Sequence, residues 1–265
     1  MTAAHPPAHP AAAPGRAPAA APGAGARIWR VVRLNLVNKW TVIWIPAMIM
    51  FFIGVVNWLI WWIIWSASAP GDRADAMDGT QWSGGAFYIF VYMMVIAIQV
   101  VSSTFPFALG YSVTRRDFAI GSGLTFLVLA AGYALGFALL STLEEWTNGW
   151  GLGGHLFTSV YFAGETFAGR LFMVFAAMLF FFAVGAFSAA LFMRWRMYGI
   201  LAAGAVLALL IVGAVALLTY TQNWPAVGEW FVANGPIGVT AWLLLPTVVA
   251  AAAGYAVLSR ATPRS

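Results

Sequence analysis

The chain alternates between long apolar runs and short polar segments. A helix needs about 20 apolar residues to cross a bilayer. A membrane β-barrel would instead show alternating segments of about ten residues. The pattern therefore predicts an all-α, polytopic membrane protein with six transmembrane helices, at residues 41–67, 85–110, 119–143, 167–193, 199–220 and 237–258.

The segments before and after these runs differ from them in composition. Residues 1–26 are almost entirely Ala, Pro and Gly, which predicts a disordered cytoplasmic tail. Residues 27–40 have a moderately amphipathic helical pattern, typical of an interfacial helix at the membrane surface or of an extension of the first span. We expect one transmembrane domain over residues 27–260 and a short cytoplasmic tail over 261–265.

Charge is scarce and unevenly distributed. Hydrophobic residues make up 62% of the chain and charged residues 8%, and the net charge of +5 is a topology signal rather than a sign of nucleic-acid binding. With both termini cytoplasmic, all Lys and Arg except Arg73 and Arg170 fall inside, and all Asp and Glu except Asp117 fall outside. This asymmetry follows the positive-inside rule and predicts a multi-pass protein of the plasma membrane.

Polar residues inside or at the ends of the spans are candidates for a pathway or gate. Such residues can line a path through the bundle, or they can make bonds between helices. Acids just beyond a span can gate a substrate, but they can also simply end the helix in water. The candidates are Asn57, Gln99, Ser102, Ser103, Glu144 and Glu145.

Three further patterns concern packing. Trp58, Trp61, Trp62 and Trp65 share one helical face, which is typical of an outer-leaflet anchor and also fits a substrate or subunit contact. Pro106 should kink the second span. Gly132-x-x-x-Gly136 is a pattern that lets another helix approach closely.

Motifs for catalysis or metal binding are not evident. The chain has no P-loop, no H-E-x-x-H, no G-x-S-x-G, no dinucleotide fingerprint and no cysteine. The histidines of the tail, His5 and His9, lack further ligands, and the loop acids Asp72, Asp75 and Asp78 lack the ligand spacing of a calcium loop. We expect neither an enzyme nor a cofactor or metal in this chain, and no span has a buried acid or base of the kind that would couple transport to ions.

The polar turn at 111–118 separates the second and third spans and must lie at a membrane surface, where its arginines indicate the cytosol. It is either a tight connector that fixes topology or a docking element for a soluble partner. With the preceding span it reads Phe105-Pro-Phe-Ala-Leu-Gly-x-Ser-x-Thr-Arg-Arg-Asp-Phe118. This stretch, the six spans and the basic entry helix resemble actinobacterial permease subunits of the type-2 ATP-binding-cassette (ABC) family.

The resemblance implies an ABC exporter in which two permeases form the pathway, as a homodimer surrounded by membrane lipid. A separate ATPase subunit would bind ATP and Mg²⁺. The coupling element that docks on it would comprise Ser112, Thr114, Arg115, Arg116, Asp117 and Phe118. Residues before the first span would form the family's connecting helix, and 221–236 its outer re-entrant hairpin, although an ordinary loop fits equally. An ATP-independent carrier or channel, or a non-transporting scaffold subunit, remains the alternative.

Overall fold

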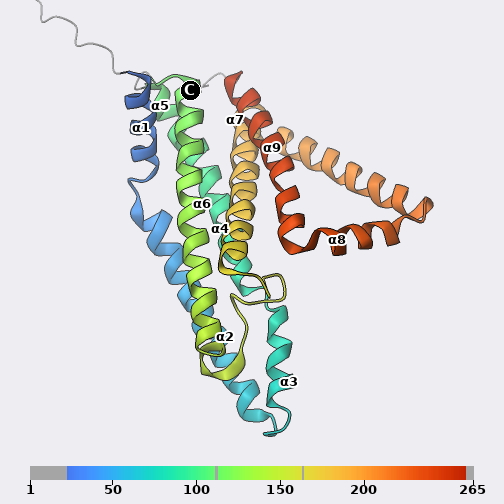
Figure 1. Cartoon of the computed structure of the whole chain (residues 1–265). Helices are drawn as coiled ribbons and strands as arrows, with labels where there is room; N and C mark the ends of the chain where they lie inside the picture. Colours follow the sequence, from blue (N-terminus) through green and yellow to red (C-terminus); the bar gives the residue numbers. More distant parts are fainter. Residues whose placement is uncertain (1–22, 111–112, 163, 261–265) are drawn as a thin grey trace, which may run out of the picture.

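The computed structural model describes residues 23–110, 113–162 and 164–260, and the described chain is helical without a β-strand (Figure 1). Residues 1–22 of the predicted tail at 1–26, the tail at 261–265 and Ser112 of the predicted docking turn lie outside the described residues. The end of the first tail was predicted wrongly, because residues 24–26 already belong to the first helix. The α-helices are α1 (Ala24–Asn35), α2 (Ile45–Ala67), α3 (Arg73–Asp78), α4 (Tyr88–Gln99), α5 (Phe105–Gly110), α6 (Arg115–Trp146), α7 (Phe167–Tyr220), α8 (Trp224–Trp242) and α9 (Leu244–Ser259).

Five helical stretches are long and apolar enough to cross a membrane, which confirms a helical, multi-pass arrangement. They are Trp40–Ala67, Arg73–Ala108, Arg115–Trp146, Phe167–Tyr220 and Trp224–Ser259. The expected fourth and fifth spans lie together in α7. Its 54 residues would extend about 80 Å if straight, far more than the roughly 30 Å of a bilayer core. The helix is interrupted at Arg196, where φ is 57° and ψ is −146°.

The core lies between α4, α6 and the first half of α7, with α9 packed on the other side of α7 (Figure 1). Phe126 of α6 stacks on Phe182 of α7 with ring centroids 4.9 Å apart. At Gly185, a Cβ atom would stand 2.4 Å from the Met94 carbonyl, so only glycine allows α4 and α7 to approach this closely. The contact is the kind of small-residue approach that membrane helices use.

The second half of α7 and α8 form an arm that diverges from the bundle (Figure 1). No residue from 192 to 246 is buried, and the arm exposes large apolar side chains such as Leu209 and Val212. Because α8 begins at Trp224, most of the segment 221–236 is helical rather than a loop. The helix is broken at Gly235, where φ is 61°.

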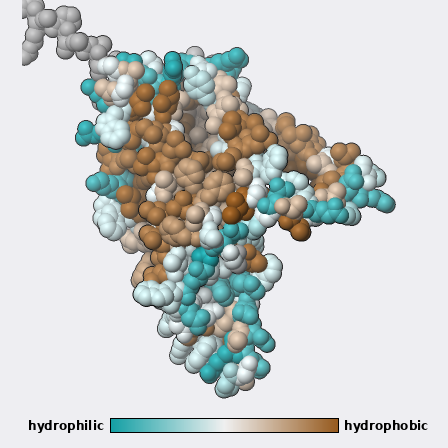
Figure 2. Space-filling view, in the orientation of Figure 1, coloured by the Kyte–Doolittle hydropathy of each residue, from teal (hydrophilic) through white to brown (hydrophobic). Residues whose placement is uncertain are grey.

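The two ends of the bundle are polar and the middle is apolar (Figure 2). One end gathers α1, α5, the start of α6 and the end of α9, while α3 lies at the opposite end (Figure 1). The first of these is called the arginine end below, because it carries Arg27, Arg30, Arg33, Arg115 and Arg116. The segment that carries the loop acids Asp72, Asp75 and Asp78 is not an irregular loop, because it contains α3 and a 3₁₀ turn at Gly79–Trp82, with Met77 buried.

Helix α1 packs lengthwise beside the start of α6 (Figure 1). Val31 lies so close to Gly121 of α6 that a Cβ atom there would be 2.7 Å from the Val31 Cβ. Asn35 donates hydrogen bonds to Ser122 (3.4 Å) and Thr125 (3.3 Å), both on α6. Residues 27–40 thus form a shorter helix than expected, ending at Asn35 and followed by a separate π-helical turn at Trp40–Trp44.

Two local packing expectations are corrected by the structure. Nothing lies within 4 Å of a Cβ built on Gly132 or Gly136, so no described helix uses that pair for a close approach. Trp61 is only 2% exposed and lies against Gly154, so it is a core residue, whereas Trp58 and Trp62 stay exposed.

The irregularity associated with Pro106 is a π-helical turn at Val100–Thr104, immediately before the proline. Proline cannot donate to the carbonyl four residues earlier, and its ring clashes with that carbonyl. A wider turn just upstream is one way in which a helix relieves this conflict.

Candidate functional site

The predicted docking turn forms a corner at the arginine end, where α6 begins. Thr114 caps α6 by accepting a hydrogen bond from the Asp117 backbone N–H (3.1 Å). Asp117 is only 6% exposed and forms an ion pair with Arg27 of α1, with 2.7 Å between Asp117 Oδ2 and Arg27 Nε. Arg115 donates to the Ser259 carbonyl at the end of α9. The corner therefore connects three helices that are far apart in the sequence.

The residues of the predicted docking set do not all face the same way. Phe118 is fully buried and packs edge-on against Phe105, with centroids 5.1 Å apart. Thr114 and Arg116 are exposed. Asp117 and Phe118 thus hold the corner to the bundle, which leaves Arg116 as the exposed charged side chain of this set.

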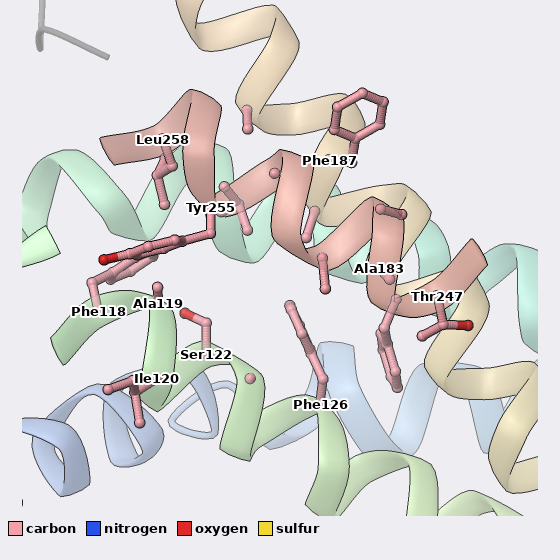
Figure 3. Close-up of a pocket in the computed structure, with 18 of the residues that line it drawn as sticks. Phe118, Ala119, Ile120, Ser122, Phe126, Ala183, Phe187, Thr247, Tyr255 and Leu258 are labelled. Atoms are coloured by element: carbon pink, nitrogen blue, oxygen red, sulfur yellow. The ribbon is translucent and has the colours of Figure 1, made fainter. Parts of the chain in front are cut away.

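A cavity of about 580 Å³ opens beside this corner, between α6, α7 and α9 (Figure 3). Both α6 and α9 pack on α7, and α7 forms the floor between them. The walls are almost entirely apolar, with Phe126 and Phe187 among the larger side chains and Arg116 at the rim. A volume of this size lies within the usual range for small-molecule sites.

The polar candidates of the first two spans do not line this cavity. Ser102 donates to the Ile98 carbonyl (2.7 Å), and Ser103 donates to the Gln99 carbonyl, so both hydroxyls return to their own helix. Asn57 donates to the Ile53 carbonyl (2.9 Å) and accepts from Ser83 (3.3 Å). Asn57 therefore faces protein as expected, but its side chain serves local structure.

Glu144 is the most heavily hydrogen-bonded acid of the described chain, at the end opposite the corner. It is 1% exposed. Its carboxylate accepts from the backbone N–H groups of Leu156 (3.0 Å), Phe157 (3.1 Å) and Thr158 (2.9 Å), from the Thr158 hydroxyl (2.6 Å) and from the Trp150 indole (3.0 Å). The expectation that it simply ends a helix in water is wrong, because the connection 147–166 folds back over it.

Arg170 provides a second buried charge near Glu144. It is 3% exposed, pairs with Glu145, and donates to the Phe162 carbonyl (3.2 Å) and the Ser141 hydroxyl (3.2 Å). The sequence-based view that no apolar run holds a buried ionisable group is therefore corrected. Both charges are fully engaged in bonds that hold the 147–166 connection to the helices.

Glycine density was the signal that could have identified the Glu144 site. Asn148, Gly149, Trp150, Gly151 and Gly153 all have positive φ, and these left-handed positions reverse the chain so that the amides at 156–158 point at the carboxylate. His155 contacts Thr158, with 3.0 Å between Nδ1 and Oγ1. Because the Thr158 hydroxyl donates to Glu144, its oxygen accepts from His155 Nδ1–H. Within the described residues, no three His, Asp or Glu side chains are grouped to hold a metal ion.

Comparisons with protein-family models, curated proteins and solved structures found no match to this chain. The class of protein therefore rests on the fold itself. Long apolar helices with polar ends define a helical, multi-pass membrane protein.

Proposed function

We propose that the chain is the permease subunit of an ABC exporter of the plasma membrane, driven by ATP and Mg²⁺ bound to a separate ATPase subunit. In this proposal α7 crosses the membrane twice, on either side of Arg196, which gives six spans and places both termini in the cytosol. The arginine end faces the cytosol by the positive-inside rule. The α1 helix is then the connecting helix, and the first part of α8 is the outer hairpin.

The observation that carries the proposal is that the corner at the start of α6 is bonded to both α1 and α9. Arg27 of α1 binds Asp117, and Arg115 of α6 holds the last carbonyl of α9. A displacement of the corner by a docked subunit is therefore transmitted to α1, α6 and α9 together. Two of these helices, α6 and α9, also wall the cavity, so the same displacement would change its shape.

The buried charges favour an external source of energy. Glu144 and Arg170 are saturated with bonds inside the protein, and Asp117 is paired. A group that carries protons or ions must exchange its partners during the cycle. These groups instead make fixed structural bonds. This supports a transporter driven by an ATPase on another subunit over an ion-coupled carrier.

The exposed arm supports a homodimer with the pathway between two copies. Between residues 192 and 246 no side chain is buried, and α8 has no buried residue at all. Lipid can cover part of this surface, but two copies would give α8 and the second half of α7 protein neighbours. Small residues such as Ala202, Ala203 and Gly204 would allow close helix packing there.

The test uses the purified chain together with the ATPase that accompanies it in mild detergent. Arg116→Glu should leave membrane insertion intact but should abolish the coupling between ATP hydrolysis and transport in liposomes. The matched control is Asp75→Arg, an equally large charge reversal at the opposite end, and it should behave as the wild type.

Three outcomes would contradict the proposal. Coupled transport by Arg116→Glu at the wild-type rate would exclude the docking role of the corner. Flux through liposomes that contain this chain alone would indicate an ATP-independent carrier or channel. A stoichiometric partner without an ATPase fold would indicate a scaffold subunit.

A further inference from the structure

The cavity between α6, α7 and α9 has the depth of one membrane leaflet. Its lining extends from Phe118 to Leu127 on α6 and from Thr247 to Leu258 on α9. At 1.5 Å per residue these stretches measure about 14 and 17 Å, close to half of the roughly 30 Å hydrocarbon core. Figure 3 places Phe118 and Leu258 at one end of the cavity and Thr247 at the other.

The interior of the cavity suits an alkyl chain. Two of its three hydroxyl groups are already engaged: Ser122 accepts from Asn35 (3.4 Å), and Thr247 donates to the Leu243 carbonyl (2.7 Å). The third belongs to Tyr255, which is exposed. Much of the space exists because small side chains face it from α7 and α9, namely Ala183, Ala186, Ala190, Ala250, Ala251 and Gly254. Such a wall offers dispersion contacts and little that would hold a polar solute.

The rim of the cavity at the arginine end is positively charged. Arg116 lines the cavity and is exposed, and no carboxylate of the described chain lies within ion-pair distance of it. The adjacent acid, Asp117, is paired with Arg27. Arg115 binds the end of α9 just beyond the rim, and Arg260 follows that helix. A ligand with its chain in the cavity would thus place its head group near Arg116, which makes no ion pair within the described residues.

We propose that this cavity binds an anionic phospholipid drawn from the leaflet at the arginine end, with one acyl chain between α6 and α9 and the phosphate at Arg116. The membrane is the source of the ligand, because the cavity is apolar over the depth of a leaflet and is charged only at its rim. The inference deepens the proposed function, since it names an anionic lipid as the class that the permease would move. The binding step itself requires no ATPase.

The test is photo-crosslinking in nanodiscs that contain only this chain, with phosphatidylglycerol that carries a diazirine in one acyl chain. Labelled peptides should map to 118–127 and 247–258. Unlabelled phosphatidylglycerol should compete better than phosphatidylcholine. Arg116→Gln should weaken the binding of phosphatidylglycerol about fivefold, because one basic residue near a membrane surface contributes roughly that factor. The charge control, Arg194→Gln, should not change it.

Two variants narrow the cavity from opposite walls. Ala186→Phe on α7 and Ala251→Leu on α9 should each reduce labelling of both peptides to background. Ala67→Phe, at the exposed end of α2 and away from both the cavity and the arm, is the matched control and should label as the wild type. Using both variants keeps the test decisive if one of them does not fold.

The proposal is overturned by labelling confined to other helix faces, which would mean surface lipid only. Equal competition by both lipids, with unchanged binding by Arg116→Gln, would also overturn it. The test of lipid binding can fail independently of the test of the proposed function. Binding without ATP-coupled transport would leave this inference standing and remove the function, and coupled transport without binding would do the reverse.

Discussion

Replacing Glu144 tests whether the buried carboxylate holds the 147–166 connection in place. In Glu144→Leu, the amides of Leu156, Phe157 and Thr158, all buried residues, lose their acceptor. An unsatisfied buried donor costs about 1–3 kcal/mol, so three give about 3–9 kcal/mol before relaxation. We expect about 4 kcal/mol, in the range of roughly 3–5 kcal/mol for breaking a buried charged network.

Glu144→Gln should cost less. The glutamine amide keeps one oxygen as an acceptor. Its NH₂ group then takes the place of Oε2, where it faces the Trp150 indole and the Phe157 amide, both of which are donors. One such conflict costs about 2 kcal/mol. Glu229 is exposed, so Glu229→Gln is the matched control and should change stability by less than about 0.5 kcal/mol.

The assay is thermal unfolding of the purified chain in detergent. For a protein of this size, 1 kcal/mol corresponds to about 2–4 °C in Tm, so Glu144→Leu should unfold about 8–16 °C below the wild type and Glu144→Gln about 4–8 °C below it. A Tm for Glu144→Leu within 2 °C or so of the control would refute the reasoning. It would mean that the carboxylate is not the acceptor for these amides in the folded protein.

Three further variants test other parts of the fold. Arg27→Gln and Asp117→Asn should each speed hydrogen exchange in α1, and the double variant should add little, because both remove the same ion pair; additive effects would show that the pair does not form. Gly121→Leu should destabilise by about 1–3 kcal/mol in chemical denaturation, because it collides with α1, whereas Gly132→Ala should be neutral or stabilising; equal effects would contradict the close approach. Arg196→Gly should raise Tm by the equivalent of about 1 kcal/mol, because only glycine adopts that backbone conformation without strain; a lower Tm would argue against the break in α7.

Much of the helical architecture could be predicted from the apolar runs alone. A long apolar run in a membrane must satisfy its own backbone, and a helix is the simplest way to do so. The span at 119–143 falls inside α6, and residues 85–108 of the run at 85–110 fall within the continuous stretch Arg73–Ala108. The boundaries were less predictable, because α6 continues to Trp146 through Glu144, whose carboxylate finds its partners inside the protein.

The features that the sequence did not reveal depend on contacts between distant segments. The side chain of Asp117 turns inward because Arg27 lies beside it, and the two are separated by 90 positions in the chain. Arg115 meets Ser259 across 144 positions. A sequence pattern along one helix contains no information about such partners. The predicted docking residues could therefore not be divided into those that bond the corner to other helices and those that face outward.

The central claim is that the corner at the start of α6 faces the cytosol, where an ATPase can reach it. The chain has no cysteine, so Arg116→Cys and Asp75→Cys each introduce a single labelling site. With a membrane-impermeant maleimide, we predict that intact cells label position 75 and that position 116 reacts only after permeabilisation. Labelling of position 116 in intact cells would contradict the orientation, and with it the proposal that a separate ATPase subunit in the cytosol drives this protein.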